Sequence, residues 1–432
     1  MPAATKSRTR SPHPEALGGV HEFFLGKGLR VLHRENRAAP AVAVCVVYHV
    51  GSRNEALGCT GSTHILEHLL FKDSEHFNKH NGREIASYLE WMGALLNAST
   101  WFDRTNYFEL MPKARVEDAL AVEADRMRGS LFNDEDLASE MTVVRNEYER
   151  GRNNPFELLD EETWGAAFLA HPYHHPTIGW KEDIEFSTAA KLREFYDRFY
   201  HPNNATLILI GDLSLADAKR LSEKYFGAIP RSPNPIPEMR VAEGEQEGAR
   251  FFELQKPGAM SAVELAYKAP SGTDADIPAL IVLAQILAGG LSSRMQTRLV
   301  DRGRAAQVSV SAHPMRDPGL IIFTAHAGEG VAPARLLAEM RAECERIASS
   351  EPPTKSEIGR AVWSLAAQYA FSRDGMLGEA MVLTEAIATG DWKLAYELPQ
   401  KFARVDAREV ARVAKKYLVR HRETAGILIG SK

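Results

Sequence analysis

The strongest constraint on the fold is an internal repeat. Residues 187–214 have the pattern of a helix, a Pro-Asn-Asn turn and an apolar strand that ends at Gly211. Residues 406–430 repeat this order, and the two strands, ATLILIG and TAGILIG, begin 219 positions apart. At the same offset, Ser187 and Asp406 are residue types that cap helix N-termini well. Because the offset is close to half of the 432-residue chain, it indicates the duplication of a unit of roughly 220 residues.

Each repeat mixes strands and helices in an order that is not a regular β-α-β alternation. In the first repeat, residues 42–50 are an apolar run typical of a buried strand, and residues 95–100 and 105–111 are predicted to be paired strands. Residues 115–127 and 134–151 have the spacing of amphipathic helices. This order predicts the α+β class, with two homologous domains that are each a mainly antiparallel sheet with helices packed on one side.

The two repeats meet at a proline-rich and then charged stretch, residues 230–248, which has the composition of a linker. We therefore expect a first domain over residues 21–232, a linker over 233–248 and a second domain over 249–432. Residues 1–20 contain basic side chains without a following apolar segment, so we expect a disordered tail there and not a secretory signal.

Composition excludes several classes of function. The formal net charge of −5 provides no basic field for nucleic acid, and no apolar run approaches the roughly 20 residues of a membrane helix. The three cysteines, Cys45, Cys59 and Cys344, are odd in number and far apart, which argues against a disulfide framework or a cysteine zinc site. We expect a cytoplasmic protein, with the periplasm as the alternative, that binds neither nucleic acid nor membrane.

One apolar segment contains candidate metal ligands. Residues 63–71, THILEHLLF, place two histidines and a glutamate among leucines and a phenylalanine. In a helix, His64 and His68 share one face and can bind one metal ion, whereas Glu67 projects nearby along a different line. The order H-x-x-E-H is the inverse of the H-E-x-x-H motif of zinc proteases. The alternative, two surface histidines beside a solvated glutamate, is disfavoured because a surface helix would not be so apolar.

A third ligand must come from elsewhere in the chain, because a catalytic zinc site has three protein ligands and one open position for water. Zinc lowers the pKa of that water to about 7, and a nearby glutamate can take its proton and pass it to the leaving amine. The predicted helix over residues 139–151 offers Glu140 and Glu147, which are seven residues apart and so lie on nearly one face. Spacing alone leaves the choice between them open.

Several segments in a consistent order resemble the M16 family of metallopeptidases, the inverzincins. They are residues 48–74 (YHVGSRNEALGCTGSTHILEHLLFKDS), 97–112 (NASTWFDRTNYFELMP), 171–184 (HPYHHPTIGWKEDI) and 195–214 (FYDRFYHPNNATLILIGDLS). The resemblance extends over nearly the whole chain. It implies a zinc-dependent endopeptidase that hydrolyses peptides or unfolded segments inside a closed chamber.

The resemblance also implies a role for each matching residue of the site. His64, His68 and Glu147 would be the ligands of one Zn²⁺ ion per chain, and Glu67 would be the catalytic base. Glu140 would orient one of the histidines from behind.

Three further residues would contact the substrate according to the same resemblance. Asn97 and Ala98 would pair with the backbone of the peptide, which adds as a strand to the edge of the sheet. Phe71 would line the pocket beside the cleavage point. The spacing from His68 to Glu147 is a few residues longer than is usual in the family, which an insertion in the intervening loops would absorb.

The second repeat lacks the metal-binding groups. Its counterpart of the histidine-bearing helix, residues 276–290, contains no histidine or glutamate. Family members that act alone also provide, from this repeat, an arginine and a tyrosine seven residues later that hold the substrate. Here Val300 and Ala306 fall where the pair is expected, and no tyrosine lies between Tyr267 and Tyr369.

The missing Arg–Tyr pair determines which partners we expect. Some family members work as two chains, of which one has the zinc motif and a related one has the Arg–Tyr pair. The resemblance therefore predicts that this chain is the catalytic subunit of such a heterodimer, or that it self-associates, with peptides as substrates. Two alternatives are a non-catalytic structural or assembly subunit, which would not need the complete metal-binding set, and a metal-dependent hydrolase of non-peptide substrates.

Overall fold

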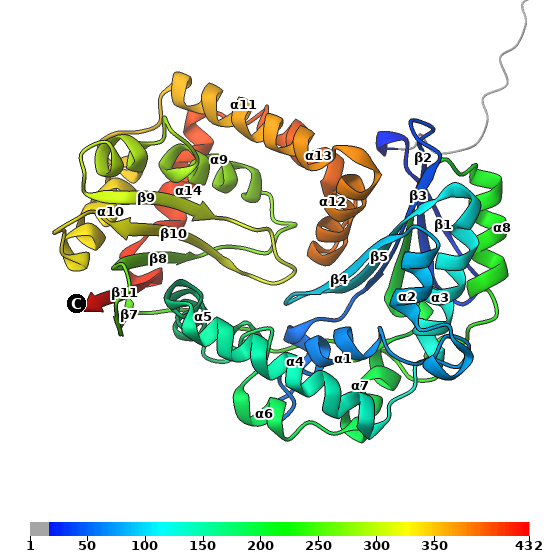
Figure 1. Ribbon diagram of the computed structural model, residues 1–432. Coiled ribbons are helices and arrows are strands. Elements are labelled where there is room, and N and C mark those ends of the chain that lie inside the picture. The colour runs from blue at the N-terminus through cyan, green and yellow to red at the C-terminus, as the bar shows by residue number, and fades with distance from the viewer. Residues whose placement is uncertain (1–16, 432) are drawn as a thin grey trace, which may run out of the picture.

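Each repeat builds one sheet. The computed structural model describes residues 17–431, and Figure 1 shows the two sheets in two lobes. The strands of the first sheet are β1 (His21–Phe24), β2 (Arg30–Glu35), β3 (Ala41–Tyr48), β4 (Leu95–Thr100), β5 (Thr105–Pro112) and β6 (Ala205–Gly211). Those of the second sheet are β7 (Arg250–Pro257), β8 (Ala262–Lys268), β9 (Ala305–Ser311), β10 (Leu320–Ala327) and β11 (Glu423–Ser431).

The two sheets share one topology. Their strand orders are β1-β2-β6-β3-β5-β4 and β7-β11-β8-β10-β9, which match strand for strand once β1 is set aside. In the described residues β2 pairs with β6 and β7 pairs with β11 in parallel, whereas the remaining pairs are antiparallel. The predicted α+β class with a mainly antiparallel sheet in each half is therefore confirmed, and the shared topology supports the predicted duplication.

Most of the helices of each half lie between its last two strands in the chain, β5 and β6 in the first half and β10 and β11 in the second. The first half contains α1 (Ser62–Leu69), α2 (Ile85–Trp91), α3 (Val116–Gly129), α4 (Asp134–Asn153), α5 (Pro155–Ala167), α6 (Lys181–Glu185), α7 (Ala189–Phe199) and α8 (Leu215–Phe226). The second contains α9 (Ile277–Ala288), α10 (Pro333–Ala348), α11 (Lys355–Ser372), α12 (Gly375–Thr389), α13 (Leu394–Phe402) and α14 (Ala407–Tyr417). Within the described part of the chain, none of them combines the length and the apolar character that crossing a membrane requires.

One of the two predicted helix caps differs from the expectation. Asp406 caps α14, where its side chain accepts hydrogen bonds from the backbone of the first turn. The cap of α7, however, is Thr188 and not Ser187. The Ser187 hydroxyl instead donates a hydrogen bond to the carbonyl of Asp183 (2.9 Å) at the end of α6, so it is not available to the following helix.

Each half provides one helix to the sheet of the other half (Figure 1). On one face the sheets pack against their own helices, α3 and α8 in the first half and α10 in the second, as predicted. On the opposite face, α12 of the second half packs against β3, β5 and β6, and α5 of the first half packs against β7, β8 and β11. Leu159 of α5 is fully buried with Ala262 and Leu428 of the second sheet. The two halves therefore share their hydrophobic cores.

The last residues of the predicted N-terminal tail are ordered in the structure. Residues 1–16 lie outside the described residues. Leu17–Gly19 form a short 3₁₀ turn, and Val20 is buried in a core that includes residues of the second half. Because this apolar contact fixes the chain at Val20, the prediction of disorder is wrong for residues 17–20.

The segment between the two halves has no regular secondary structure and is held by hydrogen bonds to both halves. Residues 231–249 contain neither helix nor strand. The Glu243 carboxylate accepts hydrogen bonds from the backbone N–H groups of Leu169, Ala170 and His171, at 2.9–3.1 Å. The predicted domain limits at residues 232 and 249 fall between the last helix of the first half and the first strand of the second.

The shared cores predict a strong effect of one substitution in α5. We expect Leu159→Ala to lower the free energy of unfolding by about 2–5 kcal/mol, because Leu159 is fully buried against the other half. Both lobes should also unfold together in one transition. Leu169→Ala is the matched control, since Leu169 is 72% exposed, and it should change stability by less than about 0.5 kcal/mol. Denaturant titration checks both values, and two separate transitions in the unchanged chain would contradict the shared core.

Candidate metal centre

The histidine-bearing helix α1 is anchored at both ends by buried side chains. At its N-terminus, Glu55 accepts hydrogen bonds from the backbone N–H groups of Gly61 (2.8 Å) and Thr63 (2.7 Å), which have no partner within the helix. At its C-terminus, the fully buried Arg126 of α3 donates from Nε to the carbonyl of Leu70 (3.0 Å). A cation is favoured at this end of a helix. These contacts fix where α1 presents its histidines.

Three predicted ligand atoms converge between α1 and α4. Nε2 of His64 lies 3.4 Å from Oε2 of Glu147, and Nε2 of His68 lies 3.5 Å from the same oxygen. The three donor atoms all lie within 4.8 Å of one another. With bonds of about 2.0–2.1 Å, the ligand atoms around a tetrahedral zinc ion are about 3.4 Å apart. The donor types and their separations therefore fit a zinc ion.

The two glutamates of α4 occupy different positions. Glu147 faces the Nε2 atoms of both histidines, whereas Oε2 of Glu140 lies 3.2 Å from Nδ1 of His68, on the other side of the ring. The second oxygen of Glu140 is 2.7 Å from Nζ of Lys72. A carboxylate on the outer nitrogen of a metal-binding histidine fixes the tautomer and the orientation of the ring. Of the two carboxylates, Glu147 is therefore the one placed beside both Nε2 atoms, whereas Glu140 lies behind the His68 ring.

Burial sets the protonation of the site. It lowers the pKa of His64 to about 4, with a contribution from the neighbouring His68, so the His64 ring is neutral at neutral pH and can offer a lone pair. Burial also raises the pKa of Glu67, although a hydrogen bond from Thr100 and the charge of His68 oppose this shift. A carboxylate with a raised pKa is a better proton acceptor in catalysis.

The predicted substrate-pairing residues lie on the free edge of a strand beside α1. Asn97 and Ala98 belong to β4, the last strand of the first sheet, which pairs with β5 alone in the described residues. The backbone N–H of Ala98 donates to its neighbour's side chain, Oδ1 of Asn97, at 2.8 Å. β4 also contacts α1. The edge is therefore open to an added strand close to the histidines.

Phe71, just after α1, packs against Tyr107 and Arg126. Its ring centroid lies 5.7 Å from that of Tyr107 and 5.1 Å from the guanidinium carbon of Arg126. It does not line the cleft described next, and its predicted contact with substrate remains a prediction.

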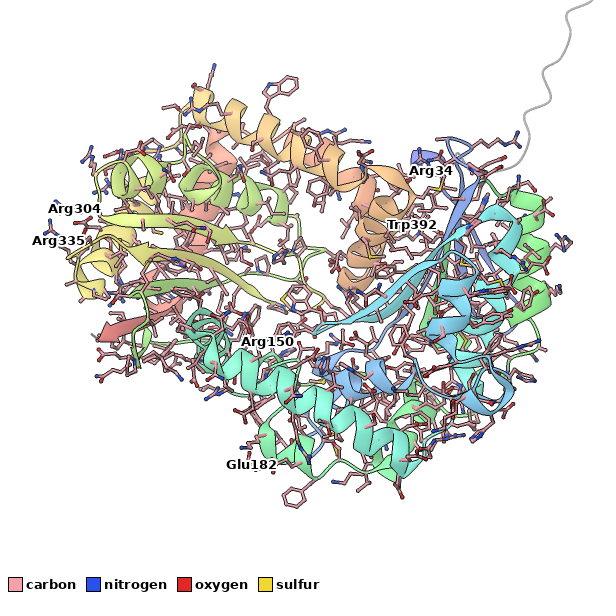
Figure 2. The ribbon with its side chains drawn as sticks, viewed as in Figure 1. Arg34, Arg150, Glu182, Arg304, Arg335 and Trp392 are labelled. Carbon is pink, nitrogen blue, oxygen red and sulfur yellow. The ribbon has the colours of Figure 1, made fainter. Side chains whose placement is uncertain are left out.

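A cleft of about 730 Å³ begins at Glu147 and runs between the two halves. Figure 2 shows Arg150, one of its lining residues, at the inner end of α4 between the lobes. Its lining includes the aromatic side chains of Trp101, Phe102 and Trp164 and the acidic side chains of Glu157, Asp160 and Glu161. Ser311 and His313 line it from the second half. The sequence did not predict these residues as parts of a cleft, because they are distant in the chain and come together only in the folded structure.

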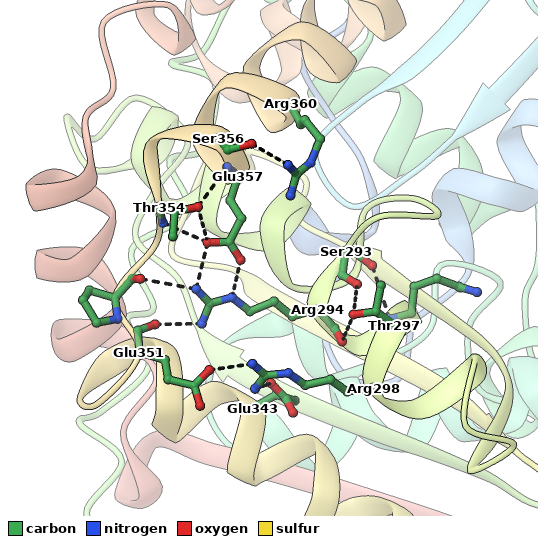
Figure 3. Close-up of polar contacts among 12 residues, drawn as sticks. Ser293, Arg294, Thr297, Arg298, Glu343, Glu351, Thr354, Ser356, Glu357 and Arg360 are labelled. Carbon is green, nitrogen blue, oxygen red and sulfur yellow. Dashed lines mark hydrogen bonds and ion pairs between the residues drawn. The ribbon is translucent and has the colours of Figure 1, made fainter.

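Two of the four arginines in residues 291–312, where the family's Arg–Tyr pair would lie, are engaged elsewhere (Figure 3). Arg294 donates to both carboxylate oxygens of Glu357 (2.7 and 3.0 Å) and to the carbonyl of Glu351 (2.7 Å). Arg298 donates to Glu343 (2.8 Å) and to the carboxylate of Glu351 (2.5 Å). These contacts tie the segment to α10, α11 and the loop between them, within the second half.

Comparison with known families identifies the chain. The family model described as "Insulinase (Peptidase family M16)" matches residues 30–179, and that described as "Peptidase M16 inactive domain" matches residues 187–365. The chain belongs to the M16 peptidase family. The two models together span both halves of this M16 chain, and the inactive-domain model falls mainly on the half without metal-binding residues.

Curated relatives of this M16 chain are named as zinc proteases. It is 29% identical over 414 residues to zinc protease PqqE of Helicobacter pylori, covering 94% of this chain and 92% of that protein. It is 26% identical over 340 residues to an uncharacterized zinc protease of Rickettsia bellii, covering 78% and 80% of the two chains.

Solved structures have the same fold. A protease from Helicobacter pylori is similar with a TM-score of 0.89 at 28% identity, over 95% of this chain and 99% of that one. The periplasmic protease PqqL from Escherichia coli is similar with a TM-score of 0.77 at 17% identity, over 98% of this chain but 48% of that one. At this identity the likeness to PqqL shows the fold alone.

Removing one carboxylate should weaken zinc binding. We expect Glu147→Gln to lower the zinc affinity of the metal-free chain by at least about tenfold, because a neutral amide replaces the anionic donor. Glu149→Gln on the same helix is the matched control, since the Glu149 side chain is 60% exposed and pairs only loosely with Lys181 (3.7 Å). Competition with a fluorescent zinc chelator measures both affinities. Equal affinities of the two variants would contradict the placement of Glu147.

The Arg294–Glu357 pair predicts a pH dependence of stability. Burial raises the pKa of Glu357, but hydrogen bonds from Arg294 and Thr354 outweigh it and hold the pKa at about 2. A lowered pKa stabilises the fold above the unfolded value of about 4.3, and this contribution is lost as the pH falls towards 2. Because solvent screens this partly exposed pair, Glu357→Gln should cost about 1–2 kcal/mol at pH 7 and much less at pH 2.5.

Denaturant unfolding of the unchanged chain and the Glu357→Gln variant at both pH values measures this difference. Glu345→Gln is the control, because Glu345 is exposed on α10 and has no ion pair among the described residues. A cost of Glu357→Gln that stays constant between pH 7 and pH 2.5 would show that the ion pair is not its source.

Proposed function

We propose that this M16 chain is a zinc-dependent endopeptidase that hydrolyses peptides or unfolded segments in the cleft between its halves. The observation that supports this most directly is the convergence of His64, His68 and Glu147 at the separations of a tetrahedral zinc site. The names of the curated relatives as zinc proteases support the same metal and the same class of reaction.

Each residue of the site has a part in the proposed reaction. Zinc held there would supply a Lewis acid and a water of lowered pKa. The carboxylate of Glu67 accepts the proton of the attacking water and delivers it to the nitrogen of the leaving amine, which its raised pKa favours. Glu140 keeps the His68 ring in place through Nδ1. The open edge of β4 holds the peptide extended beside α1 through backbone hydrogen bonds.

The second half supports a role for a partner chain. It contains no tyrosine between Tyr267 and Tyr369, and Arg294 and Arg298 are bound within their own half. We therefore propose that a related M16 chain, or a second copy of this one, completes the substrate-binding wall. The likeness to PqqL supports this proposal. It covers 98% of this chain but only 48% of PqqL, so PqqL is about as long as two such chains.

A non-catalytic subunit is the second candidate. The missing Arg–Tyr pair and the inactive-domain model favour it. The metal-binding set does not, because a purely structural chain has no need for Glu67 and Glu147 beside two histidines.

Hydrolysis of an unstructured quenched-fluorescent peptide tests the proposal. The purified chain is assayed with chelator and again with zinc restored. We expect zinc-dependent cleavage that Glu67→Gln lowers by about 10²–10⁴, with the zinc content per chain unchanged. Glu149→Gln should cleave at the rate of the unchanged chain.

If no cleavage is detected, the zinc content of the chain separates the two candidates. A silent chain that binds zinc would indicate a missing subunit, which co-purification would then identify. A silent chain that binds no zinc would favour the non-catalytic subunit.

A further inference from the structure

Resting on the proposed function, we infer that Asp317, in the half without metal-binding residues, is a positioning residue for the zinc helix α1. Asp317 lies in the loop between β9 and β10. Its carboxylate accepts hydrogen bonds from the guanidinium of Arg53 and from Nε2 of His171 (3.1 Å), both of which belong to the first half. The second half thus holds the first by a charged contact at this loop.

Arg53 is fixed in a turn just before the segment that caps α1. The residue is 8% exposed, so its charge needs a partner at this site. The backbone N–H groups of Ser52 and Arg53 donate to the carbonyls of Trp101 (3.1 Å) and Phe102 (3.0 Å), in the hairpin between β4 and β5. A side chain at Gly51 would come within 2.2 Å of the Trp101 carbonyl. The turn therefore has little freedom once Asp317 holds the Arg53 side chain.

The turn leads directly to the metal-binding residues. Glu55, two positions after Arg53, is buried and accepts hydrogen bonds from the backbone of Gly61 and Thr63. The hydroxyl of Thr63 donates to the same carboxylate. Thr63 immediately precedes His64. A continuous set of direct contacts and short chain segments therefore connects Asp317 to the first predicted zinc ligand.

The second predicted ligand helix depends on the same half by another route. α4, which contains Glu147, ends at Asn153, and α5 begins two residues later at Pro155. α5 packs against three strands of the second sheet. The two helices that provide zinc donors are therefore both held by the half that provides none.

Removal of the Asp317 charge should leave the fold intact. Arg53 Nε remains 3.5 Å from the Asp103 carboxylate, and Tyr173 continues to donate to Asp103 (2.8 Å). The backbone N–H of Asp317 lies 3.2 Å from the Tyr173 oxygen and does not depend on the side chain. The loss is thus confined to the contacts of the Asp317 carboxylate with the Arg53 turn and with His171.

A second ion pair between the halves provides the control. Arg34 of β2 pairs with the buried carboxylate of Glu379 on α12, and Figure 2 shows Arg34 where the first sheet meets the helices of the second half. This pair lies where α12 packs against the first sheet, and it does not involve the turn before α1. Glu379→Gln therefore weakens the contact between the halves without touching the connection to His64.

The test compares Asp317→Asn, Asp317→Glu and Glu379→Gln in the full chain. Zinc affinity of the metal-free chain is measured by competition with a fluorescent chelator, and the site geometry by the visible absorption bands of the Co²⁺-loaded chain. We expect Asp317→Asn to weaken zinc binding roughly tenfold, the low end of the effect of outer partners of metal ligands, and to shift the Co²⁺ bands. Asp317→Glu should restore both, and Glu379→Gln should lower thermal stability alone.

Unchanged affinity and bands in Asp317→Asn would overturn the inference, as would an equal loss of zinc affinity in Glu379→Gln. Neither result touches the proposed peptidase, which the unchanged chain tests. A lack of zinc binding by the unchanged chain would overturn the proposed function, and this inference with it.

Discussion

The reciprocal contact of α5 and α12 with the opposite sheets is the constraint on which the rest of the structure depends. A sheet with two apolar faces must have both covered, and each half has its own helices on one face only. Neither half can therefore complete its core alone, and buried pairs such as Cys45 with Thr384 (3.6 Å) join residues 339 positions apart. A duplicated unit has in this way become one cooperative structure with two different halves.

This arrangement explains how a half without candidate metal ligands can support the proposed metal site. The candidate donors lie on α1 and α4, and the distances of 3.4 and 3.5 Å between their atoms depend on how these two helices meet. Helix α1 is held by Glu55 and Arg126 at its ends, while α4 continues into α5 on the second sheet. Rigid elements that are themselves fixed by packing are the supports that a metal site needs. The second half thus supports the two helices that present the proposed zinc donors.

Sequence patterns predicted the parts of this protein that local chemistry decides. The offset between the two strands revealed the duplication, and H-x-x-E-H marked His64 and His68 together with Glu67. The choice between Glu140 and Glu147 rested on the resemblance, because helical spacing puts both on one face, and the structure distinguishes them by the nitrogen that each one faces. Sequence could not reveal which helix covers which sheet, since periodicity reports that a helix has an apolar face but not what lies against it. The capping role of Glu55 was also not predicted, because its hydrogen bonds to Gly61 and Thr63 depend on how the intervening loop folds back. The residue nevertheless lies within a segment that resembles the family.

The position of the last strand in each sheet has a consequence for how the protein is made. β6 lies between β2 and β3, and β11 lies between β8 and β7, so in both sheets a central strand is the last to leave the ribosome. Until β6 emerges, no strand connects the pair β1 and β2 to the strands β3, β5 and β4. Until α12 follows, one face of the first sheet is uncovered. Such long-range closure is slow and exposes apolar surface. The nascent chain must therefore remain protected from aggregation until synthesis is nearly complete, and its two lobes mature together and not one after the other.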